Sequence, residues 1–270
     1  MDVTEVRLGT DHVADCVPLS AAAGWNQNAA DWRLMLELGE GWGLRLRDGA
    51  LAASTLVIPY GGFAWVSMVL VLPGQRRKGY ASRLLRTALA ALARANLTPV
   101  LDATPAGREV YRQEGFRDAW SFKRFIVQRK SPRQPPSRAR ALRETDWRWI
   151  LELDRVAFGG NREPLLRSLA GRLPAAALVV EGDGFILGRD GREASQLGPL
   201  VARSAETART LLQTILAQAT GPLYLDMADH AALAPSGLAE QRSFMRMVHG
   251  AGLAPGDQRN VFLVAGPELG

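Results

Sequence analysis

The stretch from residue 71 to residue 82 brings together residue types that bind an anion. A β-rich run ends at residue 71, and a basic loop, Arg76-Arg77-Lys78, leads into an amphipathic helix that begins at Gly79. The first amide N–H groups of such a helix have no intrahelical partner, and the helix dipole adds partial positive charge there. Three cations beside these N–H groups favour a site for a pyrophosphate group, and Gly79 lets that group approach the backbone. The alternative is a solvated basic turn with a capping glycine.

The hydrophobic pattern predicts the elements that must position this loop. In the first half, alternating and β-rich runs predict strands over residues 43–47, 51–58, 66–71, 99–102 and 122–128. Helical signals predict helices that begin near Asn28, Gly79 and Pro105. In the second half, strands over 178–180, 184–187, 197–201 and 223–226 and a helix over 208–216 repeat this order weakly. We therefore predict an α/β (α+β) protein with two tandem copies of one fold, each a mixed, mostly antiparallel sheet flanked by helices.

A proline-rich segment separates the two copies. Residues 129–137 hold three prolines and no apolar side chain, which excludes a core strand. We predict a first domain over residues 1–130, a linker over 131–141 and a second domain over 142–270. The net charge of the chain is +6, and the positive excess lies in the first domain and the linker. An anionic ligand is therefore expected in the first domain.

Composition argues against several other classes of protein. No apolar run approaches the roughly 18 residues that span a bilayer, and the acidic N-terminus is unlike a signal peptide. The single Cys16 and three scattered histidines predict neither an internal disulfide nor a metal site. Basic residues with interleaved aromatic ones are not clustered as a groove for single-stranded nucleic acid would need, which disfavours that partner. We therefore expect a cytoplasmic protein with no membrane, metal or nucleic-acid partner.

Two motifs of the first domain resemble those of the GNAT N-acetyltransferase superfamily. Arg76-x-x-Gly79-x-Ala81 is similar to the coenzyme A pyrophosphate signature of that family, and Tyr111-x-x-x-Gly115-Phe116 is similar to the end of its fourth helix. The resemblance covers residues 3–128, and Gly24-Trp25-Asn26-Gln27 further resembles tandem two-domain bacterial members. It implies acetyl-CoA as the cofactor. The cofactor-binding residues that it implies are Val69, Val71, Arg76, Arg77, Lys78, Gly79, Tyr80, Ala81 and Ser82.

The resemblance also implies a mechanism, in which an amine attacks the acetyl thioester directly. The central strands of the family splay apart, and the splay falls on residues 69–71, where a backbone N–H would stabilise the oxyanion. Tyr111 matches the tyrosine that protonates the leaving thiolate, although it could instead be a core residue under the cofactor. Asp102 is the candidate base acting through water, and its alternative role is the N-cap of the helix that begins near Pro105.

The acceptor pocket of the family lies under its first two helices, where this chain has Trp25, Asn26, Gln27, Asp31 and Trp32. Two indoles near a carboxylate could hold a cationic or ring-bearing amine. In the alternative interpretation, the tryptophans are core residues and Asn26 is a helix cap. In the second domain, Asp226 is the counterpart of Asp102 and could face the acceptor, or it could be a structural cap.

The second domain has lost the features of the anion site. When the two long helices are aligned, Glu206 takes the place of Gly79, and two of the three loop cations are missing. A carboxylate in the first turn would repel a pyrophosphate and satisfy the helix N-terminus itself, with Ser204 as its cap. We therefore predict one cofactor site, in the first domain, and a degenerate second domain.

The favoured function is transfer of an acetyl group from acetyl-CoA to a primary amine of a small molecule. The alternatives are a protein or peptide amine acetyltransferase and a non-catalytic acyl-CoA sensor. Fold alone does not name an acceptor, and the sequence leaves the acyl-chain preference and the oligomeric state open.

Overall fold

The computed structural model describes residues 3–129, 138–231, 233 and 238–270. The chain divides into two compact units. The first comprises residues 1–119, 247–254 and 269, and the second comprises residues 120–246, 255–268 and 270. The predicted division into 1–130 and 142–270 stays a prediction, and most of the predicted linker lies outside the described residues. No helix in the described part of the chain is both long and apolar enough to cross a membrane.

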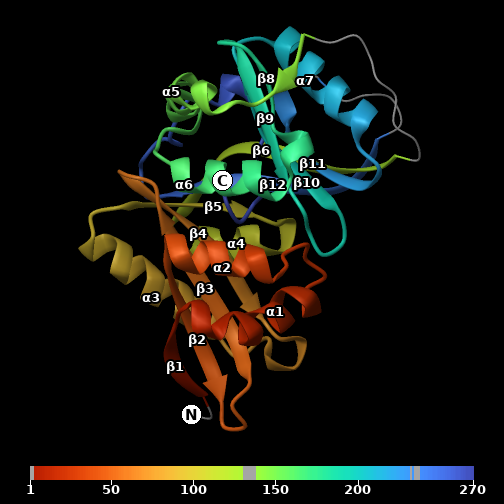
Figure 1. Cartoon of the computed structure of the whole chain (residues 1–270). Coiled ribbons are helices and arrows are strands. Elements are labelled where there is room, and N and C mark those ends of the chain that lie inside the picture. The colour runs from red at the N-terminus through yellow and green to blue at the C-terminus, as the bar shows by residue number, and fades with distance from the viewer. Residues whose placement is uncertain (1–2, 130–137, 232, 234–237) are drawn as a thin grey trace. The chain divides into compact units, whose positions relative to one another are not determined.

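The first unit is built on a mixed sheet (Figure 1). Its antiparallel strands follow one another in the order β1 (Val3–Leu8), β2 (Glu40–Leu46), β3 (Leu51–Pro59) and β4 (Phe63–Val71). A parallel strand, β5 (Thr98–Ala103), pairs with β4. The next strand in the order is β12 (Ala239–His249), whose residues 247–249 belong to this unit.

The α-helices described in this unit are α1 (Val13–Ala22), α2 (Ala29–Leu38), α3 (Tyr80–Arg94) and α4 (Pro105–Gln113). Helices α1 and α2 lie over β3 in Figure 1, and both contact that strand. The amphipathic character predicted for α3 is present, because Leu84, Leu85, Ala88 and Leu92 are buried on one side of the helix.

The second unit repeats the mixed architecture. Its strands lie in the order β6 (Phe116–Arg129), β11 (Gly221–Ala228), β13 (Val261–Leu263), β10 (Ser195–Ala202), β9 (Gly184–Arg189), β8 (Leu178–Val180) and β7 (Arg140–Ala141). Its α-helices are α5 (Trp147–Phe158), α6 (Glu163–Arg172) and α7 (Ala205–Gln218). A core of aliphatic side chains joins α7 to β9, β10 and β11. The predicted fold class, a mixed and mostly antiparallel sheet flanked by helices, is confirmed in each unit.

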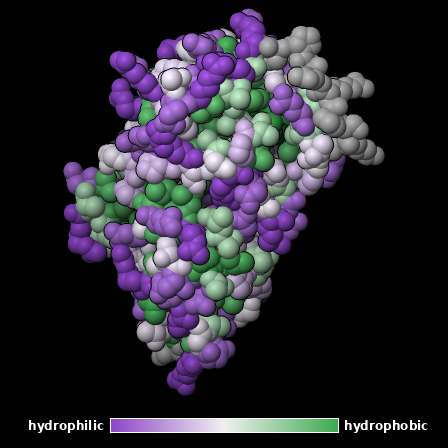
Figure 2. All heavy atoms as spheres, in the orientation of Figure 1, coloured by the Kyte–Doolittle hydropathy of each residue, from purple (hydrophilic) through white to green (hydrophobic). Residues whose placement is uncertain are grey.

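The surface mixes hydrophilic side chains with smaller apolar patches on the face drawn in Figure 2. Among the described residues, the large apolar side chains classed as exposed are Val110, Val156 and Leu253. The remaining aliphatic and aromatic residues of the strands pack mainly into the two cores.

Candidate functional site

The parallel pair β4 and β5 splays apart halfway along its length. Their pairing ends at Trp65 and Val100, although β4 continues to Val71 and β5 to Ala103. A bulge accompanies the splay, since Leu56 of β3 lies opposite Ser67 whereas Ser54 lies opposite Leu70. In this bulge Met68 has a φ of 50°, and the hydroxyl of Ser54 donates to the Met68 carbonyl at 2.7 Å. The gap predicted for the central strands is therefore present in the first unit.

The backbone N–H and C=O groups of Val71 lie on the edge of β4 that faces the gap. The N–H of Leu72 donates to the Ala52 carbonyl at 2.9 Å, which makes these two residues a hydrogen-bonded antiparallel pair. Because such pairs alternate along a ladder, the N–H and C=O of the neighbouring Val71 point away from β3. Its carbonyl accepts from Arg76 Nε at 3.3 Å. The Val71 N–H is thus directed toward the side on which β5 has separated.

The basic loop between β4 and α3 has the geometry of an anion cradle. A short 3₁₀ turn, Pro73–Gln75, follows β4, and then Arg77 and Gly79 both adopt left-handed backbone conformations, with φ of 61° and 77°. Gly79 is the N-cap of α3, so the N–H groups of the next three residues lack intrahelical acceptors. A Cβ atom placed on Gly79 would meet no heavy atom within 4 Å. The residues present therefore fit a phosphate group that lies against the backbone.

Tyr111 lies on α4 with its ring packed beside Gly107 and Phe116. A Cβ atom on Gly107 would come within 3.0 Å of the tyrosine ring, and the Phe116 ring lies edge-on at a centroid distance of 5.9 Å. Burial raises the pKa of Tyr111 to about 12. The phenol therefore stays protonated at neutral pH and can donate a proton or a hydrogen bond.

Asp102 lies on β5 beyond the last residue paired with β4, as the sequence predicted. The alternative role, N-cap of α4, is wrong. Thr104 holds that position, and its hydroxyl accepts from the Gly107 N–H at 3.2 Å. Threonine can cap a helix directly because its Oγ1 reaches the free amides of the first turn. The strand position of Asp102 is therefore not explained by capping.

The turn between α1 and α2 is organised by Asn28, not by Asn26. The Asn28 side chain accepts from the N–H groups of Ala30 and Asp31 at 3.0 and 3.1 Å, and Asp31 accepts from the Asn28 N–H in return. The idea that Asn26 caps a helix is therefore wrong, although Asn26 is buried. Because Asp31 serves this capping box, its carboxylate has a structural role.

The two tryptophans near this turn differ in their surroundings. Trp32 is fully buried, and its indole N–H donates to the hydroxyl of Ser20 at 3.0 Å, which makes it a core residue. Trp25 is half-buried and remains a candidate for contact with an acceptor.

Ser67 is a buried polar residue that sequence reasoning missed. Among the described residues, no hydrogen-bond partner lies within reach of Ser67 Oγ or of Gln27 Oε1, and both side chains are buried. The available signal was a single serine inside the otherwise apolar run over residues 63–71.

In the second unit, Asp226 belongs to a buried ion-pair network. It is fully buried, and Arg124 donates to both of its oxygens at 2.7 Å, while Gln196 Nε2 adds a third bond at 3.0 Å. Asp226 is therefore not a helix cap. Arg246, a further cation of this unit, is also buried and lies over the Trp120 ring at 4.3 Å.

The second unit fills its own splay with a strand. The parallel pairing of β10 with β11 ends at Leu197 and Leu225, after only three residue pairs. Beyond this point β13 lies between the two strands and pairs with both, because Leu263 lies opposite Leu200 of β10 and Met227 of β11. In the first unit β4 and β5 are direct neighbours, and no described strand is inserted between them.

The start of α7 also differs from the start of α3. Ser204 is its N-cap, as predicted, and accepts from the Thr207 N–H at 3.1 Å. Glu206 lies in the first turn and pairs with Arg138 at 3.0 Å. The amides of this helix start are thus partly satisfied by the chain itself.

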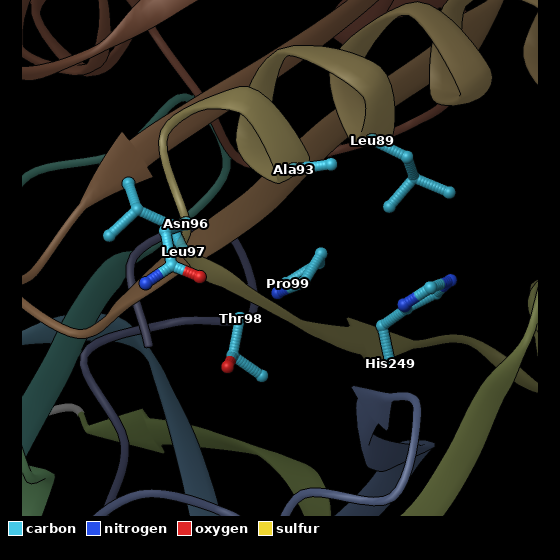
Figure 3. A pocket seen from close by; sticks show the side chains of 7 residues that line it. All are labelled: Leu89, Ala93, Asn96, Leu97, Thr98, Pro99 and His249. Carbon is cyan, nitrogen blue, oxygen red and sulfur yellow. The ribbon is translucent and has the colours of Figure 1, made fainter.

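A separate cavity of about 360 Å³ lies in the first unit (Figure 3). It is lined by Leu89, Ala93, Asn96, Leu97, Thr98, Pro99 and His249. Leu89 and Ala93 belong to the last two turns of α3, whereas the basic loop lies at the other end of that helix. Because α3 has 15 residues at about 1.5 Å each, this cavity is distinct from the anion cradle.

Comparison with known proteins agrees with this geometry. A family described as "Acetyltransferase (GNAT) family" matches residues 15–116, and one described as "Acetyltransferase (GNAT) domain" matches residues 150–263. The chain is 24% identical over 243 residues to an uncharacterized N-acetyltransferase, YitH, of Bacillus subtilis strain 168. That alignment covers 86% of each chain.

Two solved structures share the fold. A putative acetyltransferase from Pyrococcus horikoshii superposes with a TM-score of 0.83 at 20% identity, covering 100% of this chain and 96% of that one. A tandem GNAT protein from the clavulanic acid biosynthesis pathway superposes with a TM-score of 0.61 at 16% identity, covering 94% of this chain and 100% of that one. These two structures support the fold, and the two family matches with the Bacillus subtilis relative show that the chain is an acetyltransferase of the GNAT family with two GNAT domains in tandem.

Proposed function

We propose that the first unit binds acetyl-CoA and transfers its acetyl group to a primary amine of a small molecule. Acetyl transfer itself follows from the family, whereas the donor and the acceptor class are our inference. The main support for this proposal is that the gap between β4 and β5 leads directly into the basic loop that forms the anion cradle. The edge of β4 ends at Val71, and Arg76 of the basic loop already donates to the Val71 carbonyl.

The cradle would hold the phosphate groups of the cofactor. The N–H groups of Tyr80, Ala81 and Ser82 have no intrahelical acceptor, and Arg76, Arg77 and Lys78 add positive charge. The exposed Gly79 keeps the approach to these amides open, because it has no side chain.

Bound acetyl-CoA would supply the acetyl thioester at the splay. The Val71 N–H, directed away from β3, and the neighbouring backbone of Val69 would bind the polar groups of the cofactor arm and stabilise charge on the thioester oxygen. Tyr111 would hold a proton at its phenol oxygen for the departing thiolate, and its raised pKa keeps that proton in place. Asp102 would accept the proton of the amine through water.

Two features of the second unit argue against a second cofactor site there, which leaves one site per chain. Glu206 places negative charge in the first turn of α7, where a phosphate would otherwise lie. In addition, β13 occupies the gap between β10 and β11 that would receive the cofactor arm.

The test is calorimetric titration of acetyl-CoA into the full-length protein, followed by thiol release with added amines. We expect one site per chain and amine-dependent release of thiol. In a Glu206→Gly variant the stoichiometry should stay at one, because β13 still fills the second splay. Two sites in the unmodified chain would refute this assignment, and binding without thiol release would identify a sensor instead.

A further inference from the structure

We propose that Ser67 and Gln27 bind uncharged hydrogen-bonding groups of the acceptor, so that the preferred substrates are amines with a neighbouring hydroxyl or amide group. This inference rests on the proposed function, since it concerns the acceptor side of the same site. Its evidence is two buried polar atoms that have no hydrogen-bond partner among the described residues, and the place of Ser67 at the splay.

Ser67 is a buried residue whose hydroxyl has no hydrogen-bond partner in the part of the chain that the structure describes. Its exposed fraction is 6%, and no partner of its Oγ lies among the described residues. Buried polar groups are nearly always hydrogen-bonded, because losing water without a replacement costs free energy. An orphan hydroxyl in a folded enzyme therefore suggests that its partner arrives with a ligand.

The position of Ser67 puts that ligand at the splay. Ser67 lies two residues beyond Trp65, where the pairing of β4 with β5 ends, and directly before the positive-φ residue Met68. The hydroxyl is thus carried by the stretch of β4 that bends away from its neighbour. This is the stretch that leads to Val71, where we place the thioester.

The register of the sheet fixes which face carries Ser67. Ser67 lies opposite Leu56, and Leu56 lies opposite Gly41. Directly paired residues share a face, and a Cβ on Gly41 would lie 3.1 Å from Leu36 of α2. Ser67 is therefore on the face of the sheet against which α2 packs.

Gln27 supplies a second orphan atom from the connection between α1 and α2. Its exposed fraction is 3%, and its Oε1 has no partner in the described part of the chain. The adjacent Asn28 caps α2, which fixes the backbone on which Gln27 stands. A pre-organised amide oxygen of this kind accepts an N–H or O–H donor.

Three other polar side chains of β3, α1 and α2 have hydrogen-bond partners within the protein. Ser54 donates to the Met68 carbonyl, Ser20 accepts from Trp32, and the carboxylate of Asp31 serves the capping box. The two orphan atoms are a hydroxyl and an amide oxygen, and neither carries charge. A buried uncharged site disfavours a carboxylate or a second ammonium group, and it lowers the pKa of a bound amine toward the free base that attacks.

The experiment compares Ser67→Ala with Ser54→Ala in the full-length protein. Thiol release from acetyl-CoA is measured with four amines: ethanolamine and glycinamide as uncharged-side-group acceptors, and glycine and putrescine as charged ones. We expect higher kcat/KM for the first two, and Ser67→Ala should lower these values about tenfold, the loss of one hydrogen bond. The dissociation constant for acetyl-CoA should not change.

Thermal unfolding separates a substrate-binding role from a structural one. Ser67→Ala removes no bond seen in the protein, so its Tm should stay the same or rise, whereas Ser54→Ala loses the bond to Met68 and its Tm should fall. Gln27→Met keeps the length of the side chain but removes its amide oxygen. This variant should lower kcat/KM for the same two amines as Ser67→Ala does.

The outcomes distinguish this inference from the function on which it rests. A Tm loss in Ser67→Ala as large as in Ser54→Ala, or unchanged kcat/KM, would overturn the acceptor role. Thiol release with glycine or putrescine alone, or with none of the four amines while acetyl-CoA still binds, would also overturn it. Failure of the unmodified protein to bind acetyl-CoA would instead overturn the proposed function.

Discussion

Replacing Gly79 by glutamate should weaken acetyl-CoA binding about thirtyfold while leaving the fold intact. The new carboxylate would lie roughly 5 Å from the phosphates, where one charge pair costs about 1 kcal/mol under water-like screening. Gly79 is exposed, so this strongly screened value applies. Two phosphate charges then give about 2 kcal/mol, which corresponds to the thirtyfold loss.

The backbone cost of the substitution must be separated from its charge. Gly79 has a φ of 77°, and a residue with a Cβ pays about 1–2 kcal/mol in this region. Gly79→Ala carries the same cost without the charge, and its Cβ meets no protein atom within 4 Å. Both variants should therefore lose roughly 2–8 °C in Tm.

Calorimetric titration of acetyl-CoA into the unmodified protein, Gly79→Ala and Gly79→Glu gives the comparison. The alanine variant should stay within about fivefold of the unmodified protein, because it removes neither amide nor cation. Equal affinity in the alanine and glutamate variants would refute the placement of the phosphates at the start of α3.

Four further predictions follow from three buried groups. Tyr111→Phe should lower kcat about tenfold or more with an unchanged KM for acetyl-CoA, as steady-state kinetics would show. Because its pKa is about 12 in the fold and about 10 when exposed, Tyr111 should contribute stability that is complete below pH 10 and is lost as pH rises toward 12; pH-dependent unfolding checks the sign. Arg124→Met would leave the Asp226 carboxylate buried without its ion-pair partner, so unfolding of the second unit should cost about 3–5 kcal/mol less, with acetyl-CoA affinity unchanged in calorimetry. Burial, reinforced by Asp15, raises the pKa of the Cys16 thiol to about 12, so a thiol reagent at pH 8 should label it only after denaturation.

Local signals in the sequence predicted the cradle and its degenerate counterpart. A glycine after three cations placed the start of α3, and Ser204 was identified as the N-cap of α7, because caps and left-handed glycines are set by a few adjacent residues. The same local reasoning failed at Asp102, since Thr104 two residues later is an equally good cap.

Contacts between residues that are far apart in the sequence could not be predicted from such local signals. Arg124 and Asp226 are 102 residues apart, and nothing near either one indicates its partner. The strand β13 is a three-residue apolar run, which has the same pattern as many buried segments. Ser67 became conspicuous only when its hydroxyl proved to lack a partner in the described structure, which is a property of the packed fold.

Each unit is assembled from segments that are far apart in the sequence, and this affects how the chain folds during synthesis. Domains commonly fold one after another as they leave the ribosome. Here the first unit needs residues 247–254, which are made after most of the second unit, and the second unit then needs residues 255–268. Until residue 249 emerges, β5 has no strand beyond it and presents an open edge of the kind that invites pairing with another chain. Completion of both units is therefore deferred to the end of translation, and a chain that stalls near its middle is exposed to aggregation.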